Sequence, residues 1–117
     1  MIVSESFVVA DWTDPGTHPG RPIAGLHLHR SDDEAWIVLS GKLGFQIDDE
    51  RREVPAGESI LVHRGTRHSY WNATSEPARY LLVMTPRIHA LIERYTAASG
   101  PTGRRSSKST TPSSCRR

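Results

Sequence analysis

The sequence predicts an all-β fold, a small antiparallel barrel or sandwich that is followed by a single helix. Two observations indicate the strands: short segments in which apolar and polar residues alternate, and turns rich in Gly or Pro at regular spacing between them. A third observation indicates the helix, because the apolar period changes from two residues to about 3.6 residues after Pro86.

The first expected strands follow an irregular segment. Residues 11–25 are dense in Pro, Gly and Asp, so we expect turns or irregular extended chain there. Residues 26–29 alternate between Leu and His, and residues 34–39 are rich in strand-forming side chains. Residues 43–47 alternate again and lead into an acidic turn at residues 48–50.

The remaining elements are separated by clear turn signals. A strand over residues 59–62 follows a Pro-Ala-Gly turn, and strands are expected at residues 68–72 and 78–84. A helix over residues 87–97 is expected because one apolar stripe has the spacing i, i+3, i+4 and i+7. The residues of this stripe are Ile88, Leu91, Ile92 and Tyr95.

The charge is unevenly divided along the chain. The 117 residues suit one domain, which we place at residues 1–98 and which includes the helix 87–97. Residues 99–117 contain five of the 15 Lys and Arg and none of the 13 Asp and Glu, so residues 1–98 have a net charge of 10 minus 13, or −3. Because residues 99–117 also lack aliphatic and aromatic side chains, we expect a disordered basic tail.

Several classes of protein are disfavoured by composition. No apolar run approaches the ~18 residues of a membrane span, and the first residues do not resemble a signal peptide, so we expect no membrane partner. The single cysteine, Cys115, excludes an intramolecular disulfide and a Cys-based zinc site, and a cytoplasmic address is expected. The basic tail lacks aromatic residues for base stacking, so no specific nucleic-acid partner is expected.

Four residues of the predicted strands have the chemistry of a metal site. His27 and His29 are two apart on one strand and project from the same face. Glu34 opens the next strand and His68 a later one, so closure of the sheet would bring the four side chains together. Burying them without a partner is costly, and one divalent transition metal (Fe, Mn, Ni, Cu, Co or Zn) removes that cost. A surface His pair is the alternative interpretation.

Two stretches of the sequence resemble the paired motifs of the cupin superfamily. The first is His27-Leu28-His29-x4-Glu34-x6-Gly41, and the second is Pro55-Ala56-Gly57-x5-His63-Arg64-Gly65-x2-His68-x3-Asn72. The resemblance covers roughly residues 19–96 and is greatest to short single-domain proteins of the quercetin-dioxygenase-like type. It implies a jelly-roll-like β-barrel with one metal ion in its mouth, and it assigns the ligand positions to His27, His29, Glu34 and His68.

The strand phase also gives candidates for a substrate pocket. Trp36, Tyr70 and Asn72 should point inward, where they would either line a pocket or fill the barrel. His63 stands where cupins usually have proline, and it is either a further pocket residue or an exposed turn residue.

These residues predict a metal-dependent oxidoreductase of the dioxygenase type. Four protein ligands leave one or two positions on the metal for a small oxygen-rich molecule, and Glu34 is also the candidate catalytic base. A non-oxidative isomerase, lyase or cyclase is a second hypothesis, and a non-catalytic binding or sensing module is a third. Because the core is small, we expect a homodimer.

Overall fold

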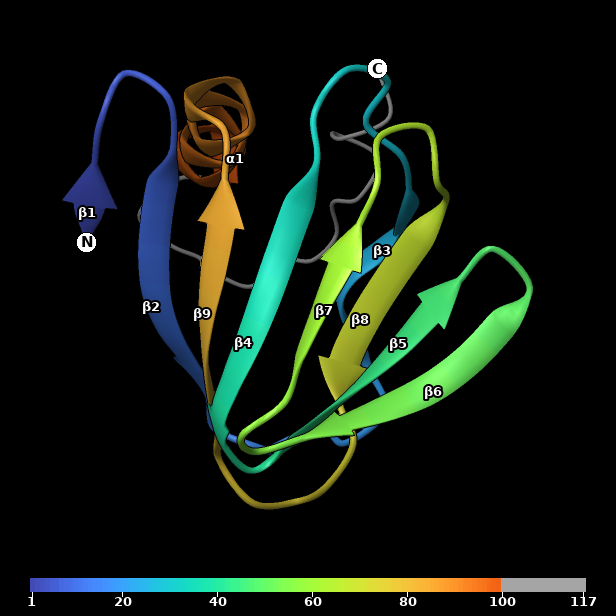
Figure 1. Cartoon of the computed structure of the whole chain (residues 1–117). Coiled ribbons are helices and arrows are strands. Elements are labelled where there is room, and N and C mark those ends of the chain that lie inside the picture. The colour runs from blue at the N-terminus through green and yellow to red at the C-terminus, as the bar shows by residue number, and fades with distance from the viewer. Residues whose placement is uncertain (100–117) are drawn as a thin grey trace.

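Two antiparallel sheets face each other and enclose the hydrophobic core (Figure 1). The structure is a computed structural model that describes the backbone of residues 1–99 and the side chains of residues 1–94. The elements of this part are β1 (Ile2–Val3), β2 (Val8–Asp14), β3 (Pro22–His27), β4 (Glu34–Ser40), β5 (Lys42–Ile47), β6 (Glu50–Pro55), β7 (Ser59–Val62), β8 (His68–Asn72), β9 (Ala78–Met84) and α1 (Pro86–Ser99). The all-β prediction is confirmed.

The order of the strands brings distant parts of the sequence to one end of the barrel. One sheet has the order β1-β2-β9-β4-β7, and the other has the order β3-β8-β5-β6. Figure 1 shows the β3–β4 and β7–β8 connections at the same end as the start of α1. We call this end the mouth, and define it by residues 28–33, residues 63–67 and the first turn of α1.

The core consists of the alternate, inward-facing residues of the central strands. In β9 every second side chain is buried between the two sheets, and the same alternation holds in β4 and β7. The buried apolar residues of these three strands are Trp36, Val38, Ile60, Val62, Ala78, Tyr80, Leu82 and Met84. Burial of a large apolar side chain contributes about 1.5–3 kcal/mol to stability. The apolar residues whose alternation predicted these strands therefore also stabilise the packing of the two sheets.

The prediction of irregular chain over residues 11–25 was wrong at both ends. The strand β2 runs to Asp14 and pairs with β9 along its whole length, from Val8 opposite Met84 to Asp14 opposite Ala78. Asp11 and Thr13 are tolerated in β2 because they lie on its outer side, where Asp11 accepts hydrogen bonds from Arg79 at 2.6 and 3.0 Å. The strand β3 begins at Pro22, in the segment where turns were expected, and it ends at His27.

The strand β6 was not predicted either. Five of its six residues are charged or proline, and Val54 is the residue of β6 that reaches the core. Because β6 pairs only with β5 and forms an edge of its sheet, its outward side chains need no apolar period. A polar edge strand of this kind has no hydrophobic pattern from which it could be predicted.

The helix α1 agrees with the predicted range of 87–97. Thr85 caps it, because its Oγ1 accepts a hydrogen bond of 3.1 Å from the backbone N–H of Ile88. Pro86 occupies the first helical position, where its missing N–H costs nothing, and Ile88 is buried against the barrel. Among residues 1–99 no helix is long and apolar enough to cross a membrane. The predicted tail began at Ser99, which is the last residue of α1, and the rest of it, with Cys115, lies outside the described residues.

Candidate metal centre

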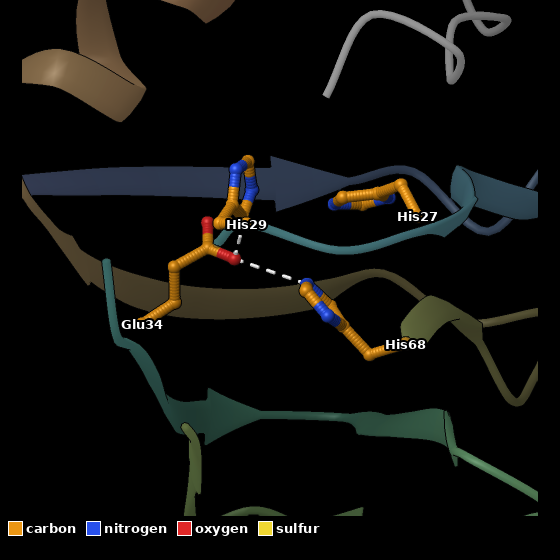
Figure 2. A group of neighbouring side chains, drawn as sticks. All are labelled: His27, His29, Glu34 and His68. Carbon is orange, nitrogen blue, oxygen red and sulfur yellow. Dashed lines mark hydrogen bonds and ion pairs between the residues drawn. The ribbon is translucent and has the colours of Figure 1, made fainter. Parts of the chain in front are cut away.

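Four candidate ligands lie together at the mouth (Figure 2). His27 ends β3 and pairs with His68, the first residue of β8, in the register of the second sheet. His29 lies two residues beyond the end of β3, and Glu34 opens β4 in the facing sheet. The ends of three strands from two sheets therefore supply the group, and Figure 2 shows the four side chains turned toward one another.

The distances within this group suit one metal ion. The candidate donor atoms of the four residues all lie within 4.8 Å of one another. Glu34 Oε1 is 3.0 Å from His68 Nε2 and 3.4 Å from His29 Nε2. Donors that share an ion at about 2.1 Å are at most about 4.2 Å apart, so a shift of about half an ångström would close the group around an ion. The four residues could hold a metal ion.

Burial makes the same group expensive without an ion. The exposed fractions are 6% for His27, 8% for His29, 5% for Glu34 and 1% for His68. A buried set of imidazoles and a carboxylate satisfies only part of its hydrogen-bonding capacity internally. Nitrogen donors with one carboxylate oxygen are typical of Fe, Mn, Ni, Cu, Co and Zn sites rather than of Ca²⁺ or Mg²⁺ sites.

Backbone carbonyls orient two of the imidazoles. The Nδ1–H of His27 donates to the carbonyl of Gly25, and the Nδ1–H of His68 donates to the carbonyl of Thr66 at 3.0 Å. In His27 this bond sets the tautomer in which the proton is on Nδ1 and the lone pair is on Nε2, whereas Nε2 of His68 also lies within hydrogen-bonding distance of Glu34 Oε1, at 3.0 Å. Such outer partners are the usual way in which proteins orient metal-binding histidines. Both rings therefore point Nε2, the atom that would bind a metal ion, toward the centre of the group.

The charge state of His27 is also suited to metal binding. Burial, reinforced by repulsion from the neighbouring His68, lowers the pKa of His27 from 6.5 to about 4. The imidazole is consequently neutral at pH 7, and its Nε2 lone pair is available without loss of a proton.

Hydrogen bonds between the β3–β4 and β7–β8 connections form a clamp at the mouth. Asp33 accepts hydrogen bonds from the backbone N–H of Arg64 at 2.8 Å and from its guanidinium at 3.1 and 3.2 Å. The Arg64 guanidinium holds the pKa of Asp33 at about 2, so the pair is charged over the whole physiological range. In addition, the N–H of Gly65 donates to the carbonyl of His29 at 2.7 Å. The segment 63–65 thus fixes the backbone on either side of the candidate ligands.

Trp36 and Tyr70, two of the predicted pocket residues, lie in the core beneath the candidate ligands. The Trp36 ring centroid is 5.7 Å from that of His68 and 5.2 Å from that of Tyr70. The hydroxyls of Tyr70 and Tyr80 share a hydrogen bond of 3.0 Å, and burial raises the pKa of both phenols. These contacts fill the barrel below His68, and a contact of Trp36 or Tyr70 with substrate stays a prediction.

Asn72 and His63, the other two predicted pocket residues, lie at opposite ends of the barrel. Asn72 ends β8, about 13 Å along the strand from His68, and its amide is used in the turn before β9. There it donates to Asp14 and to the carbonyl of Glu76, and it accepts from the N–H of Thr74. His63 is exposed in the β7–β8 connection. The structure therefore gives Asn72 a structural role at the opposite end of the barrel.

The chain also matches known proteins. The family described as "Cupin domain" matches residues 17–84, which is more than half of the chain and includes all four candidate ligands. The chain belongs to the cupin family. This cupin is similar to an uncharacterized protein with a double-stranded β-helix domain from Klebsiella pneumoniae, at 26% identity and a TM-score of 0.62 over 74% of this chain and 68% of that chain.

Two further matches are to proteins with named activities. A "predicted oxalate decarboxylase" from Thermotoga maritima is 25% identical, with a TM-score of 0.60 over 69% of this cupin and 67% of that chain. A "Quercetin 2,3-dioxygenase" from Bacillus subtilis (strain 168) is 40% identical over 45 residues, which are 38% of this cupin. The match spans 13% of the length of that dioxygenase.

Proposed function

We propose that this cupin binds one divalent transition metal and is an oxidoreductase of the dioxygenase type that acts on a small oxygen-rich organic molecule. The observation that supports the proposal most strongly is the buried set of His27, His29, Glu34 and His68, whose donor atoms lie within 4.8 Å of one another. The 45-residue similarity to a quercetin dioxygenase favours oxidative chemistry and suggests flavonols and β-diketones as first substrates.

The proposed site would carry a net charge of +1, from a 2+ ion, three neutral imidazoles and one carboxylate. When bound, the ion would supply Lewis acidity and coordination positions for an anionic oxygen or for O₂. The net positive charge favours a substrate that binds as an enolate, phenolate or carboxylate. The protein residues therefore both hold the ion and select the ionised form of the substrate.

Glu34 is the proposed base. Its contacts with His29 and His68 both use Oε1, so Oε2 is the oxygen to which we assign the proton of an acidic substrate O–H. Its burial excludes bulk water from this oxygen, which makes the carboxylate a stronger hydrogen-bond acceptor than it would be in solvent.

The first experiment is elemental analysis of the protein purified without chelators, with O₂ uptake followed after loading with Fe(II), Mn(II), Ni(II) or Cu(II). We expect one bound metal per chain, O₂ uptake with a flavonol or a β-diketone, and loss of both in His68→Ala. His18→Ala is the matched control because His18 is exposed in the loop before β3. A fully metal-loaded protein that takes up no O₂ with any substrate contradicts the dioxygenase proposal.

The similarity to a predicted oxalate decarboxylase supports a second candidate, a non-oxidative lyase or isomerase that uses the same metal and the same base. Turnover that persists under strictly anaerobic conditions identifies this candidate. Ligand binding without any product, and with an affinity that His68→Ala leaves unchanged, would instead identify a non-catalytic binding module.

We further propose that the cupin functions as a homodimer. Its small core is accompanied by apolar side chains on the outer face of the first sheet, where Leu61 is 52% exposed and Leu39 is 41% exposed. Sedimentation of the wild-type protein and of Leu61→Lys tests the proposal. A wild-type protein that sediments as a monomer at micromolar concentration contradicts it.

A further inference from the structure

A cavity of about 270 Å³ opens at the mouth, beside the candidate metal centre. One wall comes from the connection between β3 and β4, and the other comes from α1, which Figure 1 shows at the same end of the barrel. The residues on which its chemistry depends are His29, Arg30, Arg87, Ile88, Leu91 and Arg94. Because His29 is also a candidate ligand, a molecule in this cavity lies next to the metal centre.

The cavity has an excess of positive charge. Arg87 is neutralised, because its guanidinium donates two hydrogen bonds of 3.1 Å to the carboxylate of Asp32 in the same wall. Within the described residues, Arg30 and Arg94 form no ion pair with an acidic side chain. The sequence beyond Ser99 contains no Asp or Glu that could supply one. The lining therefore has two guanidinium groups without a counter-charge.

The rest of the lining is apolar. Ile88 is buried and Leu91 is half-buried, and both face the cavity from α1. A bare inorganic anion gains nothing from such a wall, whereas an organic anion can place its carbon skeleton against it. Guanidinium groups pair with carboxylates through two parallel N–H···O bonds, which gives direction as well as strength.

We propose that this cavity binds the carboxylate group of a small organic acid, through Arg30 and Arg94, with its apolar body against Ile88 and Leu91. The bound acid is then the substrate of the proposed oxidoreductase, and this assignment rests on the proposed function. Because His29 lines the same cavity as the two arginines, a hydroxyl or keto oxygen next to the carboxylate would be within reach of the metal centre. The proposal therefore narrows the substrate from an oxygen-rich molecule to a hydroxy or oxo acid.

Binding is tested with benzoate and with benzamide, which has the same shape and no charge. The full-length protein is stripped with a chelator, so that the measurement does not depend on the metal, and the methyl NMR signals of Ile88 and Leu91 are followed. We expect benzoate to shift these signals and to bind about tenfold more weakly in Arg30→Gln and in Arg94→Gln, whereas benzamide binds weakly throughout.

Two further variants sharpen the test. Arg52→Gln, on the exposed edge strand β6, removes the same charge from a residue that does not line the cavity and should leave benzoate affinity unchanged. Asp32→Asn releases Arg87 from its ion pair and should tighten benzoate binding severalfold. Thermal unfolding of each variant shows that the fold is intact.

The outcomes separate this proposal from the proposed function. Benzoate affinity that is indifferent to Arg30 and Arg94, or equal binding of benzamide, overturns the carboxylate site even in a protein that takes up metal. Inorganic phosphate that displaces benzoate at equal concentration overturns the assignment to an organic acid. Arginine-dependent benzoate binding in a protein that takes up no metal supports the carboxylate site and refutes the proposed oxidoreductase.

Discussion

Gly41 ends the first cupin motif, and the structure shows why an L-amino acid with a side chain is excluded there. Its φ angle is +77°, in the left-handed region, at the turn between β4 and β5. A Cβ atom added at this position would lie 2.6 Å from the carbonyl oxygen of Pro77 and 2.8 Å from the Cα of Ala78. Both are backbone atoms, of the residue before β9 and of its first residue, so no side-chain rotation relieves the contact.

The cost of Gly41→Ala follows from these two features. The left-handed conformation costs alanine about 1–2 kcal/mol, and displacement of packed neighbours costs about 1–3 kcal/mol more. The sum is about 3.5 kcal/mol at the centre of these ranges. A domain of this size loses about 4–8 °C in Tm for each kcal/mol, so we expect Tm to fall by about 14–28 °C.

Gly57→Ala is the matched control. Gly57, in the second motif, has a φ angle of +91°, but nothing lies within 4 Å of an added Cβ. This variant should therefore lose only the conformational part, about 1–2 kcal/mol. Urea unfolding monitored by circular dichroism gives the loss in the free energy of unfolding for both variants. Equal losses in the two variants would refute the packing argument, and a loss below about 1 kcal/mol in Gly41→Ala would refute the backbone argument as well.

Three further predictions concern the site and the core. A bound metal at about one hundred times its Kd should stabilise the wild-type protein by about 2.7 kcal/mol, and calorimetry should show no such gain in His68→Ala. Above about pH 10 the unfolded chain ionises its tyrosines while burial keeps Tyr70 and Tyr80 protonated, so the contribution of these two tyrosines to stability is constant below that pH and falls above it. Each tyrosine lowers the folding equilibrium constant by about tenfold per pH unit in this range. The urea midpoint of Tyr70→Phe should therefore fall less steeply with pH than that of the wild type. Equal slopes of midpoint against pH would contradict this prediction. Arg64→Gln removes an exposed ion pair, so Tm should hardly change, but metal affinity in competition titrations should fall severalfold because the clamp keeps only its two backbone hydrogen bonds.

The sequence predicted those parts of the fold whose side chains meet the core. The strands β4, β7 and β9 alternate because one face of each is buried, and this alternation is visible without any tertiary information. The strand β6 could not be predicted in this way, because an edge strand with exposed side chains has no such pattern. The outer residue Asp11 weakened the signal of β2, since its pairing with Arg79 depends on a strand 68 residues away.

The candidate site was predictable to a similar degree. The two-residue spacing of His27 and His29, together with the paired motifs, was sufficient to select the four side chains that converge. The groups that orient them could not be selected, because the acceptors for His27 and His68 are backbone carbonyls, which every residue possesses. The pairing of Asp33 with Arg64 joins residues 31 apart in the sequence, and only the folded chain shows that it closes the mouth.

The same interactions bear on how tightly a metal ion would be held. The clamp at the mouth and the carbonyl acceptors hold the backbone and two of the imidazoles through contacts with the protein itself. Part of the cost of ordering the ligands therefore belongs to folding rather than to metal binding. A metal ion that enters such a site has little reorganisation to perform, so its binding free energy is retained as affinity and as added stability of the folded state. Tight binding that left the unfolding temperature unchanged would show that the ion occupies a different site.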